Sequence, residues 1–502
     1  MIASSAVRAM VSVGLANAIA LGSAQAQQPA AGTATLEEVV VTANRRVENI
    51  QQVPIAVAAI SAESAAAHGI TDMQSFANAV PGLRVDRATA TALPFLRGVG
   101  SPVGQVSAEP SIAYYVDDVY TPAAGAALSN FSSIASLEVA KGPQGTLFGR
   151  NATGGVIQVF TKNPDPEPAM DVALGYANYD TFSGSAYATG GLSDTLSANI
   201  AVYGGDQGSG WGDNLTTGND AFETNEYYGG RVKLLWSPSD ATSVLLAFDH
   251  DKTKSSQGFY RPVHGTVGAG FYPAPDGWYD MVDNTDPFWE VKQSGASLKI
   301  TQDLSWSKLV SITAYRDTEQ VQLFDQSAAP VPIAVVNISG PTKTFTQEFQ
   351  FLSPKDSAVT WIAGLFYMSD ESGYDPLRIS GGFAESFGFP FVQTHTEQET
   401  KSYAGFAQVN WEVFDATHLT LGARYTVDER DISASFNFGD VFVGPVANSP
   451  QSDDWSKPTM RVSLDHQFTD DVMAYVAYNR GFKSGMFNAV VFPGSTIGDP
   501  VE

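Results

Sequence analysis

The stretch LTLGARYTVD, Leu419 to Asp428, alternates between two kinds of side chain with a period of two. One set is apolar: Leu419, Leu421, Ala423, Tyr425 and Val427. The other set is polar, charged or small: Thr420, Gly422, Arg424, Thr426 and Asp428. Because successive side chains of a strand point to opposite faces, this pattern predicts a strand with one apolar and one polar face. The segments Val310–Tyr315 and Thr344–Phe351 repeat the pattern.

The connections between such segments decide between two β architectures. Tight turns are expected at 193–194, 237–240, 303–305, 354–357, 415–417 and 469–470, and long loops at 255–291, 370–397 and 431–454. Short turns on one side and long loops on the other are typical of a transmembrane β-barrel. The architecture of a soluble β-sandwich does not explain this asymmetry. A barrel also tolerates Arg424, Asp428 and Glu348 in a wet interior, whereas a sandwich core would need each of them paired. About 13 strands can be counted from Met170 to Phe482 by this pattern.

Composition excludes several classes of protein. The 502 residues include 46 Gly, 29 Phe and 19 Tyr, which favours turns and aromatic-rich strands. The net charge of −25 comes without a basic stripe, so nucleic acid is not an expected partner. The chain has no Cys, and its six His show no ligand spacing, so the sequence predicts no metal site and no cofactor. It contains no HExxH or GxSxG motif, and we expect no enzymatic activity.

The N-terminus predicts export. Arg8 precedes an apolar run from Ala9 to Leu21, and Ala24-Gln25-Ala26 has the small-x-small pattern of a cleavage site, so residues 1–26 are interpreted as a signal peptide. An N-terminal anchor helix is the weaker alternative, since a span needs roughly 20 apolar residues.

Residues 51–165 predict a small α+β domain. We expect a strand at Val53–Val57, helices at Ser61–Gly69 and Thr71–Ala79, short strands at 83–85, 95–98, 112–116 and 134–139, and a glycine-rich hairpin at 141–160. Asp117 and Asp118 are a poor acid/base pair, because neighbouring side chains in a strand point to opposite faces. We expect the two residues to close a turn before Tyr120. Three prolines in Asn163–Pro168 mark the boundary with the β region at 170–502.

Several motifs resemble those of the TonB-dependent outer-membrane receptors. They are LEEVVVTANRR (36–46), VPIAVAAIS (53–61), FLRGVG (95–100), YYVDDVY (114–120), LEVAKGPQGTLFGRNATGGVIQVFTK (137–162) and YVAYNRGFKSGMFN (475–488). Two residues depart from the family pattern: Lys141 stands where Arg is usual, and Asp118 where Gly is common. The resemblance implies a mainly β protein, a plug domain inside an antiparallel transmembrane barrel of about 22 strands. It also implies outer-membrane lipid around the barrel and active uptake of a scarce ligand, with siderophore-bound iron favoured.

The resemblance further implies a periplasmic partner, TonB. Residues 27–50 would form a linker that carries the TonB box, made of Glu37, Glu38, Val39, Val40, Val41, Thr42 and Ala43. An extended segment of this kind can add as an edge strand to a partner sheet. The alternative is a flexible linker that happens to be rich in Val.

Four charged residues are candidates for holding the plug inside the barrel: Arg97, Glu138, Lys141 and Arg150. The surrounding glycines, Gly142 to Gly155, are interpreted as structural, because the run lacks the Gly-Lys-Ser/Thr ending of a phosphate-binding loop. For ligand contact, the best candidates lie in the aromatic loop Gly258–Trp289: Tyr260, Arg261, His264, Trp278 and Tyr279. The same aromatic residues suit a membrane-interface girdle equally well.

Three other functions stay open: a saccharide or other nutrient receptor of the same family, a passive porin-like channel, and a surface protein that binds or signals without transport. Thirteen strands would leave an open sheet with unpaired edges in lipid. We therefore expect the sequence to be C-terminally truncated, with about 250 further residues in the whole receptor.

Overall fold

The structure is a computed structural model, and it describes residues 40–128, 131–224, 226–257, 259, 261, 263, 265–267, 272–355, 357–469, 472–491, 497, 498 and 500. The predicted signal peptide and the first three box residues, Glu37 to Val39, lie outside this range. Within it, no helix is both long enough and apolar enough to cross a membrane.

The first part of the described chain, up to Thr161, forms the plug, a small α+β domain as predicted. Its helices are η1 (Ile50–Gln52), α2 (Ala62–Ala67), α3 (Met73–Ala79) and η2 (Ala124–Leu128), and its strands are β3 (Ala56–Ser61), β4 (Leu83–Ala88), β5 (Thr91–Leu96), β6 (Val99–Gly100), β7 (Ile112–Val116), β8 (Val119–Tyr120), β9 (Ile134–Lys141) and β10 (Gly155–Thr161). One sheet has the order β3-β9-β10-β7-β8, in which β10 and β7 are parallel, and β4-β5-β6 form a second sheet. The strand predicted at Val53–Val57 is wrong in its bounds, since β3 begins at Ala56.

Local sequence explains the two α-helices of the plug, α2 and α3. The side chain of Ser61 accepts a hydrogen bond from the Ser64 amide at the start of α2, and Asp72 and Ser75 form a capping box at the start of α3. Phe76 of α3 is fully buried in the cluster that contains Leu137 of β9. The capped helices thus cover part of one face of the plug sheet.

The second part of the chain is one large antiparallel sheet, here called the wall. Its strands are β11 (Ala169–Ala177), β12 (Thr181–Ser193), β13 (Leu196–Asp206), β16 (Glu226–Ser239), β17 (Thr242–Ser255), β18 (Phe288–Asp303), β19 (Lys308–Asp325), β20 (Val335–Leu352), β21 (Val359–Ser380), β22 (Phe391–Phe414), β23 (Thr417–Phe438), β25 (Gln451–Thr469) and β26 (Val472–Arg480). They pair in chain order from β11 to β26, and β24 (Val441–Pro445) adds to β23. Among the described residues this gives the thirteen strands that the alternation predicted, with β11 and β26 at the edges of the sheet.

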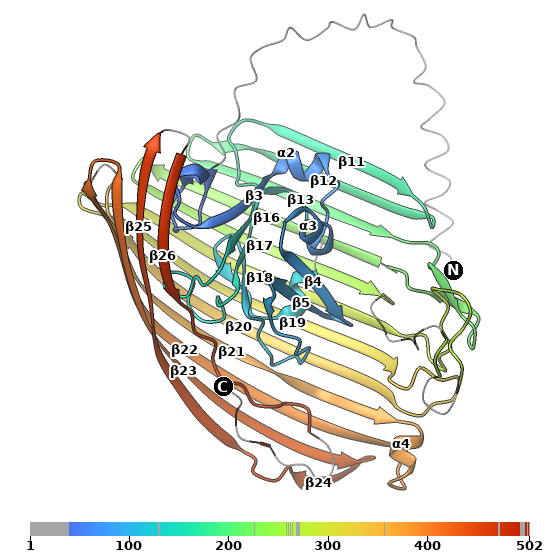
Figure 1. The fold of residues 1–502 in the computed structure, drawn as a ribbon. Helices are drawn as coiled ribbons and strands as arrows, with labels where there is room; N and C mark the ends of the chain where they lie inside the picture. The colour runs from blue at the N-terminus through green and yellow to red at the C-terminus, as the bar shows by residue number, and fades with distance from the viewer. Residues whose placement is uncertain are drawn as a thin grey trace, which may run out of the picture. The chain divides into compact units, whose positions relative to one another are not determined.

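The wall has two chemically different faces, and the plug lies against its concave one, the inner face (Figure 1). On β23, Arg424 and Asp428 point inward and are almost fully buried, whereas Leu421 and Tyr425 on the outer face are about half exposed. The alternation predicted for Leu419–Asp428 is therefore confirmed, with the polar set facing the plug.

Connections at one rim are short and those at the other are longer, as predicted. Only two residues separate β12 from β13, β16 from β17, and β22 from β23. The prediction of long loops at 370–397 and 431–454 is wrong over most of their length. Strands β21, β22 and β23 continue through these segments, with polar residues on the outer face. The opposite rim carries the hairpin β14 (Gly212–Asn214) and β15 (Asn219–Ala221) and the short helix α4 (Gly382–Glu385).

The two-faced wall predicts a position-dependent cost of charge on β23. Leu421→Arg would place a guanidinium on the apolar part of the outer face, and we expect it to lower the free energy of unfolding in lipid vesicles by about 2 to 4 kcal/mol. Glu429→Arg is the matched control on the same face, eight residues further along, where Lys401 is its neighbour in β22. Denaturant unfolding should leave that control within about 0.5 kcal/mol of the parent. Equal losses in both variants would contradict the assignment of the faces.

Candidate functional site

The described part of the predicted box, Val40 to Ala43, lies against the plug. Val40–Val41 form β1, which pairs antiparallel with β2 (Glu48–Asn49). Val41 and Ala43 are 1% exposed, whereas Val40 is 50% exposed. One face of the segment is thus docked and the other is open, and among the described residues β1 pairs with β2 alone.

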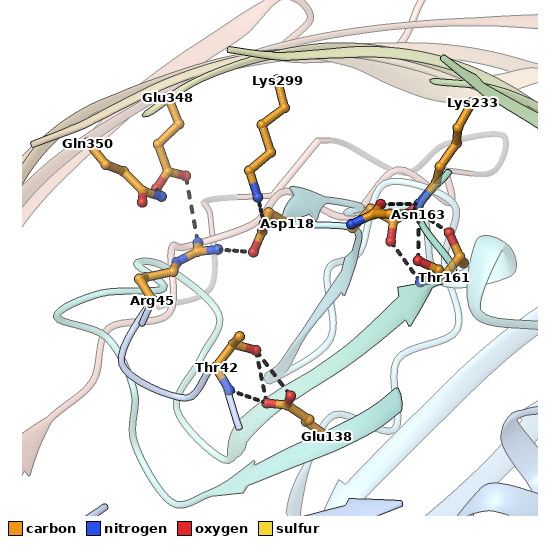
Figure 2. A network of polar contacts seen from close by, with 11 residues as sticks. Thr42, Arg45, Asp118, Glu138, Thr161, Asn163, Lys233, Lys299, Glu348 and Gln350 are labelled. Atoms are coloured by element: carbon orange, nitrogen blue, oxygen red, sulfur yellow. Dashed lines mark hydrogen bonds and ion pairs between the residues drawn. The ribbon is translucent and has the colours of Figure 1, made fainter. Parts of the chain in front are cut away.

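Glu138 of β9 holds this segment. The Thr42 backbone N–H donates to Glu138 Oε2 at 2.9 Å, and the Thr42 hydroxyl lies 3.1 Å from both carboxylate oxygens (Figure 2). Leu137 and Val139 point into the plug core, so Glu138, between them, faces the opposite side of the sheet. Burial raises the pKa of Glu138 to about 7, although the hydrogen bonds from Thr42 act in the other direction.

The two arginines that follow the box tie it to the plug and to the wall. The Arg45 guanidinium is 3.4 Å from Asp118 and 3.6 Å from Glu348 of β20, and it lies over the rings of Tyr115 and Phe148 at 4.8 and 4.4 Å. Burial alone would lower the pKa of Arg45, but Glu348, Tyr115 and Asp118 outweigh it and raise the pKa.

Arg46 reaches the short-turn rim of the wall. Its Nη2 donates to the carbonyl oxygens of Ser353 and Trp361 at 3.1 and 2.8 Å, and to the Ser353 hydroxyl at 3.0 Å. These residues flank the turn between β20 and β21. The box segment therefore lies at the short-turn end of the wall.

The Asp117-Asp118 turn carries the contacts between plug and wall on this side. Both residues have positive φ, 49° and 69°, and join β7 to β8, so the predicted turn before Tyr120 is confirmed. Asp117 lies 3.0 Å from Lys233 of β16. Asp118 lies 2.6 Å from Lys299 of β18, as Figure 2 shows.

Both carboxylates are held in the ionised form. Burial would raise the pKa of each, but the wall lysines outweigh it, helped by Thr161 hydrogen bonds at Asp117 and by Arg45 at Asp118, so both pKa values are lowered. Sequence reasoning missed these partners because residues 118 and 299 are 181 positions apart. The one signal in the sequence for such a contact was Asp118 itself. It is a charged residue in a left-handed backbone conformation, which glycine adopts more easily.

Of the four charged residues predicted to hold the plug, Arg150 contacts the wall. Its guanidinium pairs with Glu109 of the plug and lies 3.2 Å from Asp428 of β23, and Arg430 of the same strand lies 3.1 Å from Glu109. All four side chains are less than 10% exposed. Burial lowers the pKa of Arg150, against the attraction of Asp428.

Among the described residues, the other three form no hydrogen bond or ion pair with the wall, which corrects that expectation. Glu138 binds the box segment instead. Lys141 donates to the carbonyl oxygen of Pro81 inside the plug. Arg97 is exposed in the turn between β5 and β6, where its backbone N–H bonds Gly82, and it forms no ion pair with any described residue. The spacing of these residues in the sequence did not reveal their partners within the plug.

The aromatic loop is described only in part, and Tyr260 and His264 lie outside the described residues. Trp278 and Tyr279 are 76% and 55% exposed at the rim opposite the box, and Tyr279 makes an edge contact with Trp211 at 5.9 Å. Arg261 is half-buried. Ligand contact by these residues stays a prediction.

The buried Arg150 network predicts strong coupling across the interface. Arg150→Ala and Asp428→Ala should each lower the free energy of unfolding by about 3 to 5 kcal/mol, because each removes one charge from a buried network and leaves the remaining charges unbalanced. The double variant should lose at least about 1 kcal/mol less than the sum, as about 0.5 to 3 kcal/mol is typical of residues in contact. The exposed pair Arg84–Asp86, at 2.8 Å, is the matched control, with an expected coupling below about 1 kcal/mol. Additive losses for Arg150 and Asp428 would contradict this account.

Burial of Glu138 predicts that docking of the box depends on pH. The docked carboxyl has a pKa of about 7 against 4.5 in water, so proton uptake favours the docked state. Docking should be strongest near pH 4.5 and weaken as the pH rises through 7, by about 1 to 3 kcal/mol. The mobility of a spin label at Val40 should report this. Glu138→Gln keeps an acceptor for Thr42 without the charge and should abolish the pH dependence; an unchanged profile in that variant would exclude Glu138 as its cause.

Comparisons with known proteins agree with this architecture. The model of the TonB-dependent receptor plug domain matches residues 49–156, and that of the TonB-dependent receptor-like β-barrel matches residues 160–500. The pesticin receptor of Yersinia enterocolitica is 23% identical over 441 residues, 86% of this chain and 61% of that protein. The vitamin B12 transporter BtuB of Vibrio vulnificus is 24% identical over 484 residues, 91% and 72% of the two chains.

Solved structures show the same fold. The ferric yersiniabactin uptake receptor FyuA from Yersinia pestis superposes with a TM-score of 0.77 at 20% identity, covering 89% of this chain and 67% of that one. The ferric-catecholate import receptor Fiu from E. coli gives 0.69 at 14% identity, covering 87% and 71%. The chain spans about three fifths of the length of the pesticin receptors that it matches. Plug and wall models together match most of the sequence, and the chain belongs to the TonB-dependent receptor family.

Proposed function

We propose that this chain serves in the energy-coupled uptake of a scarce ligand across the outer membrane of a Gram-negative bacterium, with siderophore-bound iron as the first candidate. The observation that carries the proposal is the placement of residues 40–46. One short segment contacts the plug through Thr42 and both plug and wall through Arg45. A pull on it therefore acts on the contacts that hold the plug.

The proposed periplasmic partner is TonB, which would bind residues 37–43 by strand addition. The half-docked geometry supports this mode, because β1 pairs on one side only among the described residues and Val40 is exposed. Backbone hydrogen bonds would supply affinity, and alternate side chains would set the register. The apolar outer face supports a surrounding of membrane lipid.

Relatives suggest the ligand class. FyuA and Fiu are named for ferric yersiniabactin and ferric catecholates, and BtuB for vitamin B12. Because two of these structures are named for iron chelates, siderophore-bound iron is the candidate that we favour over a saccharide or another nutrient. A passive channel, or a protein that only binds ligand, would not require the docked strand β1 to be linked to the contacts between plug and wall.

A proline in the box separates transport from binding. Val40→Pro removes a backbone donor from the strand that the partner would join, so energised cells should lose at least about nine tenths of their uptake of ⁵⁵Fe-labelled ferric yersiniabactin or ferric catecholate. Binding of the same chelate to de-energised cells should be unchanged, since the box lies at the opposite rim from the aromatic loop. Ala31→Pro, ahead of the box, is the matched control and should transport normally. Full uptake by Val40→Pro would refute the role of the box.

A further inference from the structure

We propose that a polar groove on the outer face of β20–β23 binds a membrane-lipid headgroup in which a phosphate lies next to a primary amine, as in phosphoethanolamine. The inference goes beyond ligand uptake and rests only on the proposed placement of the wall in a membrane. Three charged side chains that line the groove carry it: Lys343, Glu371 and Glu397.

The groove is a large feature of the outer face, with a volume of about 720 Å³. Pro341 and Lys343 of β20 line it together with Glu371 and Gly373 of β21 and Glu397 of β22. A β-carbon at Gly373 would lie 1.9 Å from a backbone oxygen of β22, so only glycine fits at this point of the lining.

The loop after β24 bounds the groove beside β23, where Pro445, Ser449 and Pro450 line it. This loop is fixed to the strand by two hydrogen bonds at Ala434. The Ala434 backbone N–H donates to the Ser449 hydroxyl at 2.9 Å, and its carbonyl oxygen accepts from the Val446 backbone N–H at 2.9 Å. The groove therefore has a fixed boundary on this side.

An aromatic row on the outer face places the groove relative to the membrane. The row consists of Tyr315, Phe345, Tyr367, Tyr403 and Tyr425, on β19 to β23 in turn. The ring centroids of Phe345 and Tyr367 are 6.2 Å apart, and those of Tyr367 and Tyr403 are 5.3 Å apart. Aromatic rows of this kind mark the membrane interface of β-barrels.

The charged residues of the groove lie just beyond this row, on the side away from the short turns. Lys343 is two residues from Phe345, and Glu371 is four residues from Tyr367, so each shares the outer face with its ring. In strands tilted by about 40° these separations correspond to rises of about 5 Å and about 10 Å. The headgroup layer on each side of a bilayer is about 5 to 8 Å thick. The groove thus begins at the level of the lipid headgroups.

Charges elsewhere on the outer face already have partners on neighbouring strands. Lys252 of β17 lies 3.2 Å from Glu290 of β18, and Lys292 of β18 lies 3.7 Å from Glu319 of β19. These pairs need no external ligand.

The charges of the groove differ from these pairs. Within the described part of the chain, the side chains of Lys343, Glu371 and Glu397 form no hydrogen bond or ion pair, although Lys343 and Glu371 are cross-strand neighbours. The remaining charged carboxylate of the lining, Asp375, is already bonded to His395 Nδ1 at 2.8 Å. One cation and two carboxylates are therefore left to face the groove.

This set of charges selects a headgroup with both signs. A phosphate alone would match Lys343 but would meet two carboxylates, and an amine alone would match the carboxylates but would meet Lys343. A phosphate next to a primary amine satisfies both, since the amine donates up to three hydrogen bonds and the phosphate accepts from lysine. A quaternary amine has no N–H to donate to Glu371 or Glu397.

The test uses the full chain reconstituted into phosphatidylcholine vesicles that contain equal small amounts of phosphatidylethanolamine and phosphatidylglycerol with the same acyl chains. After extraction in mild detergent, native mass spectrometry counts the lipid molecules that stay bound. Relative to its share of the vesicle, the parent should retain phosphatidylethanolamine at least about tenfold more than either other lipid, because one charge-assisted hydrogen bond is worth about a factor of ten.

Variants assign the preference to the groove. Glu371→Gln combined with Glu397→Gln should lower retention of phosphatidylethanolamine to that of phosphatidylglycerol, and Lys343→Gln should lower it at least about tenfold. Glu319→Gln is the matched control, because it is the same change on the same face at a carboxylate that Lys292 already neighbours, and it should stay within about twofold of the parent.

The outcomes separate the groove from the membrane placement. Equal retention of phosphatidylethanolamine and phosphatidylglycerol by the parent, or an unchanged preference in the double variant, would overturn the headgroup site. Failure of the parent chain to insert into the vesicles would instead overturn the proposed placement in a membrane, and the site with it.

Discussion

The structure depends on one electrostatic constraint: charges on the inner face of the wall are removed from water by the plug, and each needs a partner there. A buried charge that loses its partner costs about 3 to 5 kcal/mol, far more than an exposed ion pair contributes. Lys233, Lys299 and Glu348 meet this constraint through plug residues, whereas Arg316 meets it through Asp249 on the wall itself. The wall charges that pair with plug residues therefore fix how the plug is seated.

The same constraint explains why this interface is not simply apolar. An apolar interface of equal area could be as stable, but it would separate only with exposure of its whole surface to water. A few charged contacts can be exchanged one at a time for water and for new partners. The Asp117-Asp118 turn concentrates such contacts in two residues, next to a box segment that supplies one of the cations.

The fold was largely predictable because it follows from local patterns. The alternation in Leu419–Asp428 places Arg424 inside and Tyr425 outside without any knowledge of the neighbouring strands. Strand ends were less predictable: β21 and β22 continue past the expected loops because their outer residues turn polar, and a polar run in the sequence is also typical of a loop.

The site was less predictable because its contacts join residues far apart in the chain. Arg150 could be named from its motif, but Asp428, its partner, could not be chosen from many carboxylates without the fold. Glu138 lies close to Lys141 in the sequence, yet the pleat of β9 turns it toward Thr42, and only the seating of the box segment explains why a carboxyl is buried there. Sequence motifs thus determine the fold of the plug, and charged residues determine its position against the wall. The charge pairs depend on the register of the wall strands. Asp118 pairs with Lys299 on β18, and Arg45, which also pairs with Asp118, contacts Glu348 on β20.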